Sequence, residues 1–123
     1  MRAFGRAIIF LGVAVAALPV ARAQLVGEAK LQQMSQALKL TSDQKEKLRP
    51  ILLDEASQVK QIRNNPTLSP EQKVDKELDV RQSYRQKIDL ELSPSQLRQV
   101  KQLREREDQQ VRARIKSEGA QQK

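Results

Sequence analysis

The sequence predicts an all-α protein, on three observations. Three short strings of the form Leu-[Thr/Ser]-x-x-Gln each open a stretch rich in Lys, Arg, Glu and Gln. Aliphatic residues in these stretches recur every three or four positions, which is the period of a helix that buries one face. No segment alternates polar and apolar residues with a period of two, and β-branched residues never cluster, so nothing indicates a strand.

Residues 1–23 are predicted to be a secretory signal peptide that is absent from the mature chain. Arg2 and Arg6 give a positive start, an apolar run follows over 7–18, and Ala21-Arg22-Ala23 forms a cleavage signal. The apolar run is shorter than the roughly 20 residues that cross a bilayer. We therefore expect cleavage after Ala23, a mature chain that begins at Gln24, and a periplasmic location. The alternative is an uncleaved membrane anchor.

The remaining chain is long enough for one small domain with a thin core. Of the 23 basic residues, three arginines precede Gln24, which leaves 20 against 15 acidic residues and a net charge of about +5. The chain has no Cys, so no disulfide supports it in an oxidising compartment. Tyr84 is the one aromatic residue after position 23. Because so little apolar surface makes a compact monomer marginal, we expect self-association.

The three strings predict three helix starts. The Thr or Ser hydroxyl can accept a hydrogen bond from the backbone N–H three residues on, and Gln at that position can bond back to the cap's own N–H. Pro70 and Pro94 occupy the first helical position, where a missing N–H costs nothing. We assign a structural, helix-capping role to Leu40, Thr41, Gln44, Leu68, Ser69, Gln72, Leu92, Ser93 and Gln96.

These starts and the aliphatic spacing predict three to four helices, over 28–39, 41–63, 70–90 and 94–117. We expect residues 24–28 to fray before the short first helix. Pro50 lies well inside the second helix, where we expect a bend and not a break, because the aliphatic spacing continues through it. The helical domain thus covers 24–117, and the polar residues 118–123 are predicted to form a disordered tail.

Charged residues interrupt the apolar faces of these helices. They are Glu55, Arg81, Arg85, Arg104 and Glu107. A dry four-helix core cannot hold them unless they pair or reach water, although long side chains can bury their stems and keep their charged ends wet. We therefore expect an open, layered helical hairpin in place of a closed bundle. These charged residues either lie at the edges of the contact between helices and extend into solvent, or form a mixed basic and apolar surface that partners contact.

The residue types argue against an enzyme. The chain has no His and no Cys, which removes most nucleophilic, acid–base and transition-metal chemistry. Glu105, Glu107 and Asp108 form the densest acidic cluster, but arginines alternate with them, so we expect ion pairs within that helix. The four glycines are scattered and form no phosphate-binding loop. We expect no catalytic residue, metal or cofactor.

The basic charge raises nucleic acid as a partner. The export signal, the interspersed acidic residues and the lack of aromatic residues for base stacking argue against it. A membrane-surface role would require bulky aromatic residues opposite the charges, and these are missing too. We therefore expect neither a nucleic-acid partner nor an integral membrane segment after processing.

The repeated string resembles the motif of the LTxxQ family of periplasmic proteins, the Spy/CpxP-like group. Residues 40–44 and 92–96 carry the resemblance, with 68–72 as a third, Ser-containing variant. The resemblance implies a curved, cradle-like antiparallel dimer of helical hairpins that acts as an ATP-independent chaperone or modulates envelope-stress signalling. Some relatives bind metals through His and Met-rich segments. This chain has no His and only Met34 after processing, so no metal is carried over.

Together these features indicate a homodimeric, holdase-type chaperone of unfolded or partly folded periplasmic proteins. Acidic clients would be attracted to basic residues and held by weak apolar contacts on the same faces. The candidate client-binding residues are Arg81, Arg85, Arg104 and Arg114. The alternative is a regulatory protein that docks on the membrane sensor of an envelope-stress response.

Overall fold

The computed structural model describes residues 18–121, with side chains from 22 to 117, and this part of the chain is helical with no strand. The helices are α1 (Leu18–Leu38), α2 (Ser42–Arg63), α3 (Pro70–Asp89) and α4 (Pro94–Gln121). The prediction of an all-α fold is confirmed. The helix α2 continues through Pro50 without a break, as expected.

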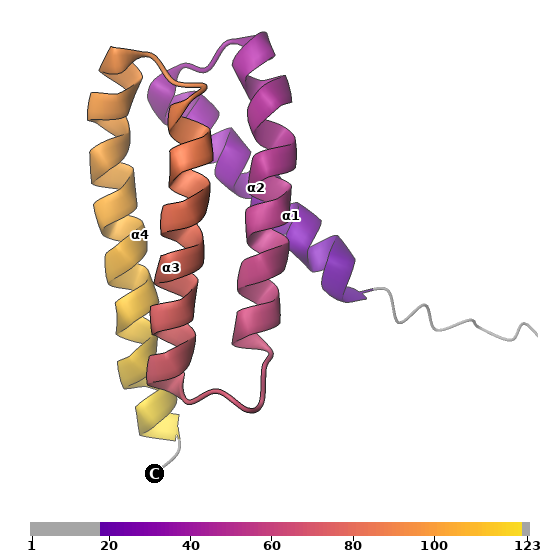
Figure 1. Ribbon diagram of the computed structural model, residues 1–123, viewed down its shortest axis with the longest axis vertical. Helices are drawn as coiled ribbons and strands as arrows, with labels where there is room; N and C mark the ends of the chain where they lie inside the picture. The colour runs from indigo at the N-terminus through magenta and orange to yellow at the C-terminus, as the bar shows by residue number, and fades with distance from the viewer. Residues whose placement is uncertain (1–17, 122–123) are drawn as a thin grey trace, which may run out of the picture.

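Three of the helices form a layer, and the first crosses it. Figure 1 shows α2, α3 and α4 side by side, with α1 running obliquely across one face of that layer. The helix α1 packs chiefly against α2 and also contacts α4. This is an open, layered arrangement of two helical hairpins, α1–α2 and α3–α4. The antiparallel dimer remains a prediction.

Two helix boundaries differ from those predicted. The helix α1 begins at Leu18, so residues 24–28 are helical, and the expectation that they fray is wrong. Gly27 lies inside this helix, close to Leu52 and Leu53 of α2. The helix α4 continues to Gln121, so residues 118–121 are not the predicted disordered tail, and a single glycine costs a helix only about 1 kcal/mol. Residues 1–17 of the predicted signal peptide, and 122–123, lie outside the described residues.

The apolar core gathers at the end of the molecule where the two hairpin turns meet. Its buried members are Leu31, Met34, Leu38, Leu40, Leu48, Leu52, Ile88, Leu92 and Val100. They come from all four helices and from the leucines of the first and third capping strings. The core is small, as the composition predicted, and buried charges occupy the layer beyond it.

All three predicted capping boxes are present. Thr41 and Ser69 each accept from the backbone N–H of the Gln three residues later, and that Gln accepts from the N–H of the cap. Ser93 and Gln96 form the same pair of bonds, at 3.3 and 2.9 Å.

The glutamines of the first and third boxes also bond to each other. The Gln44 Nε2 group donates to Gln96 Oε1 at 2.7 Å, and Gln96 Nε2 donates to Gln44 Oε1 at 3.1 Å. Each amide also donates to a carbonyl of the opposite hairpin turn: Gln44 to Glu91 at 2.9 Å, and Gln96 to Leu38 at 3.1 Å. We call this reciprocal pair the glutamine clasp. It joins the α1–α2 turn to the α3–α4 turn and uses every donor and acceptor of both amides.

The glutamine clasp predicts unequal effects of the same substitution at two capping boxes. Gln72 is exposed and bonds only within its own box, so Gln72→Ala should cost about 0.5–1.5 kcal/mol of unfolding free energy. Gln96→Ala leaves buried partners on two turns unsatisfied and should cost about 2–4 kcal/mol. Urea unfolding followed by circular dichroism measures both. Equal losses would show that the clasp adds nothing to the cap.

Candidate functional site

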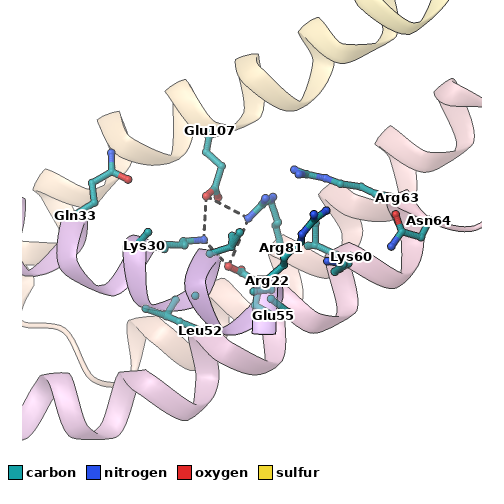
Figure 2. Close-up of a pocket in the computed structure, with 16 residues that line it drawn as sticks. Arg22, Lys30, Gln33, Leu52, Glu55, Lys60, Arg63, Asn64, Arg81 and Glu107 are labelled. Atoms are coloured by element: carbon teal, nitrogen blue, oxygen red, sulfur yellow. Dashed lines mark hydrogen bonds and ion pairs between the residues drawn. The ribbon is translucent and has the colours of Figure 1, made fainter. Parts of the chain in front are cut away.

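A cleft of about 510 Å³ lies between α1 and α2. Its walls are aliphatic: Ala23, Val26 and Ala29 on α1 face Leu52, Ala56 and Val59 on α2. Figure 2 shows charged side chains gathered at this cleft. The cleft therefore combines small apolar walls with ionic groups.

Gly27 allows α1 to approach α2 closely beside the cleft. A Cβ atom at this position would lie 3.0 Å from Cα of Leu53 and 3.1 Å from the carbonyl oxygen of Leu52. Real Cβ atoms rarely approach backbone so closely, so any larger residue would push the helices apart. The small residues on α1 thus set the width of the cleft.

The inner end of the cleft is closed by four alternating charges, one from each helix. Lys30 of α1 pairs with Glu55 of α2 at 2.5 Å and with Glu107 of α4 at 3.0 Å. Arg81 of α3 pairs with the same two carboxylates, at 3.5 and 3.2 Å (Figure 2). We call these four residues the charge square.

The charge square is largely withdrawn from water. Glu55 is 1% exposed and Arg81 is 9% exposed. Two buried atoms of the square, Glu55 Oε2 and Arg81 Nε, have no hydrogen-bond partner within the described chain. Because an unpaired buried charge is costly, displacement of any one helix would leave charges of the other helices unpaired and destabilise the fold.

Two further groups of ion pairs extend the charge square along α3. Glu77 is fully buried and is paired with Arg63 of α2 at 2.7 Å, with Arg114 of α4 and with Arg81. Arg85 bonds to Glu107 at 3.0 Å and to Asp108 at 2.6 Å. The interior of the layer therefore holds a polar core of ion pairs in addition to further buried aliphatic residues, Val59, Val74 and Val111.

These pairs change the interpretation of the four predicted client-binding arginines. Arg81 and Arg85 are buried, and Arg114 bonds to Glu77 across the layer. Arg104 pairs with Asp89 of α3 at 2.6 Å. All four bond to carboxylates within the fold, and Arg104 and Arg114 remain partly exposed. Their role in client binding stays a prediction. The sequence indicated that charged residues can lie in the core only if they pair or reach water, and the buried charges do form pairs.

The acidic cluster of α4 also pairs differently from the prediction. Glu107 and Asp108 were expected to bond to arginines of their own helix. They bond instead to residues of α1 and α3, because their side of α4 faces those helices. The periodicity of the aliphatic residues identified the inward face of α4, but it did not identify the residues on α1 and α3 that pair with this face.

A pattern in the sequence could have indicated the charge square. Glu55 and Glu107 follow Gln44 and Gln96, the glutamines of the clasp, at the same separation. The aliphatic residues Leu48 and Val100, and Val59 and Val111, match at the same offset. The helices α2 and α4 thus repeat one pattern, and the two matching glutamates meet at Lys30 and Arg81.

The electrostatic surroundings of Glu107 favour its ionised form. Burial alone would raise the pKa of this carboxyl, but attraction to Lys30 and Arg81 and hydrogen bonds from Lys30 and Arg85 outweigh that effect. The pKa of Glu107 is therefore held below its ordinary value of 4.5. Burial and a hydrogen bond to Asp54 raise the pKa of the Tyr84 hydroxyl to about 12, so this group stays neutral.

The outer end of the cleft is basic. Arg22 of α1 and Lys60 of α2 line it together with Asn64, the residue that ends α2. No residue between 22 and 117 pairs with the Lys60 ammonium. Leu25 and Val26, 70% and 59% exposed, are the large hydrophobic residues of α1 that reach solvent nearby. The cleft thus runs from a neutralised inner end to a cationic outer end.

No cluster of three or more His, Cys, Asp or Glu side chains is placed to hold a metal ion in the described part of the chain. None of its helices is both long and apolar enough to cross a membrane.

Comparisons with family models, curated proteins and solved structures found no match to this chain. The resemblance to the LTxxQ family therefore stays a hypothesis that depends on the capping strings.

The charge square predicts that Arg81 is far more important to folding than Arg104. Arg81→Gln leaves buried carboxylates on three helices without their shared cation and should cost about 3–5 kcal/mol of unfolding free energy. Arg104→Gln removes a partly exposed pair and should cost less than about 1 kcal/mol. Urea unfolding measures the difference, and similar losses for the two variants would contradict the assignment.

The lowered pKa of Glu107 predicts a pH-dependent contribution to stability. A carboxyl whose pKa is depressed in the folded state stabilises it above the ordinary pKa, and the contribution is lost as pH falls through the folded value. The wild-type protein should therefore exceed Glu107→Gln in unfolding free energy at pH 7, and this gap should close below about pH 4.5. Urea unfolding from pH 7 to pH 3 measures it, with the exposed Glu105→Gln as control. A constant gap would show that Glu107 acts by packing alone.

Proposed function

We propose that this protein is a periplasmic, ATP-independent holdase-type chaperone of the Spy/CpxP-like kind. The observation that carries the proposal is the α1–α2 cleft, which places aliphatic walls beside cations at the molecular surface. Unfolded proteins expose aliphatic residues, and acidic ones would also be attracted to a basic surface. A surface that offers both apolar contact and positive charge suits weak, broad binding of such chains.

Export is part of the proposal. The charged start, apolar run and Ala21-Arg22-Ala23 signal support removal of residues 1–23. The mature chain would lose Arg22 and Ala23 from the outer end of the cleft. Lys60, Val26 and the walls on α2 would remain, together with the net charge of about +5.

The contact surface proposed here differs from the one expected from the sequence. The predicted arginines are engaged within the fold, so Val26 and Lys60 beside the cleft are the contact residues proposed here. Long-range attraction to the basic protein would bring an acidic client close, and exposed aliphatic side chains would then hold it. A dimer would carry two such clefts, and self-association is retained as part of the proposal.

An aggregation assay tests the holdase function. Equimolar protein without ATP should slow the aggregation of an acidic client, and the protection should weaken as salt rises to about 0.5 M, where the Debye length is roughly 4 Å. Lys60→Glu should reduce protection by several-fold, because it reverses the charge beside the cleft. Lys76→Glu, an exposed position on α3 away from the cleft, is the matched control.

Two outcomes would redirect the proposal. Absence of protection for several clients at low salt would overturn the holdase function. Recovery of a single partner in a fixed ratio from periplasmic extract would favour the alternative, a regulatory protein that docks on a membrane sensor.

A further inference from the structure

We propose that the α1–α2 cleft is also a binding site for a single-chain anionic amphiphile, an alkyl carboxylate. Its hydrocarbon tail would lie between α1 and α2, and its carboxylate would meet Lys60 at the outer end. This inference goes beyond the holdase proposal, because it concerns a small molecule and does not require client binding or export.

The dimensions of the cleft suit one narrow chain. Its lining covers residues 22–33 of α1 and 52–64 of α2, about 17 Å of helix at 1.5 Å per residue. A volume of about 510 Å³ falls within the range of small-molecule sites. Spread over that length, it leaves room for a single alkyl chain and not for the two chains of a phospholipid.

The walls provide the chemistry that an alkyl tail requires. Val26 and Ala29 on α1 face Leu52, Ala56 and Val59 on α2. The charged side chains Lys30 and Glu55, which also line the cleft, are paired with each other. Gly27 fixes the spacing of the two helices, so this site forms together with the fold. A tail placed here would remove its methylene groups and the aliphatic walls from water together.

The charges give the ligand a direction. At the inner end, Lys30 and Arg81 are already neutralised by Glu55 and Glu107 (Figure 2), so a second anion gains little there. At the outer end, Lys60 is half-buried and has no carboxylate partner between residues 22 and 117. An anionic head group is therefore favoured beside Lys60, and a cationic one is disfavoured.

Removal of residues 1–23 would leave this site largely in place. Arg22 and Ala23 line only its outer end, whereas Lys60 and the aliphatic residues on α2 belong to any mature form. The proposal is therefore tested on protein recovered from cells that express the full sequence, in whichever form it accumulates.

Calorimetric titration with hexanoate, octanoate, decanoate and dodecanoate, below their micelle concentrations, tests the site. One molecule should bind per chain, and affinity should rise about fourfold for each methylene, the equivalent of about 0.8 kcal/mol, until the cleft is full. Decyltrimethylammonium, which carries the opposite charge, should bind at least tenfold more weakly than decanoate. Affinity independent of chain length, or equal for both head groups, would overturn the proposal.

Two variants locate the site. Lys60→Glu should weaken decanoate binding at least tenfold, while Lys76→Glu should leave it unchanged. Ala56→Phe should fill the cleft and abolish binding, with circular dichroism confirming that the helices persist. Equal affinity in Lys60→Glu and Lys76→Glu would overturn the proposal even if Ala56→Phe failed to fold. Binding to phospholipid vesicles without binding of free carboxylates would also contradict it.

The aggregation assay in amphiphile-free buffer separates this inference from the holdase proposal. Protection of clients without decanoate binding would leave the holdase function intact and remove the amphiphile site. Decanoate binding without protection of any client would support the site and remove the holdase function.

Discussion

The charge square is the constraint on which the arrangement of the four helices depends. Each helix contributes one member, and the charges alternate, so every residue has two oppositely charged neighbours. Burying such a set adds little net stability compared with apolar residues of similar size. We infer that its effect is on specificity, because a helix that rotated or slid would leave a buried charge without a partner. A chain with so few aliphatic residues gains its unique packing in this way.

The glutamine clasp applies the same principle at the other end of the apolar core. Gln44 and Gln96 satisfy each other and two turn carbonyls, so the hairpin turns cannot shift independently. Since Glu55 and Glu107 follow these glutamines at the same separation, one repeated pattern on α2 and α4 produces both polar layers. The core leucines pack next to the clasp and are bounded by the charge square beyond.

Local features of this fold could be predicted from the sequence, and partnerships could not. The capping boxes depend on residues three positions apart, so the helix starts at Thr41 and Ser93 can be predicted from the local sequence alone. The close approach of Gly27 in α1 to Leu52 and Leu53 of α2 is a contact between distant residues, which no local pattern contains. Likewise, the periodicity of the aliphatic residues places Arg81 on the inward face of α3. It does not show whether the guanidinium reaches solvent or pairs with a buried carboxylate. That choice was made by carboxylates on three helices.

The internal use of the arginines has a consequence for where this protein can bind other molecules. Cations that are shared among buried carboxylates hold helices together, and attracting a client with them would weaken the fold. We expect binding to use groups outside the polar core. The cleft beside Val26 and Lys60 is one place where aliphatic and basic groups line the same volume. The charge square closes that cleft at its inner end and neutralises it there, so the structure that fixes the fold also gives the cleft its polarity.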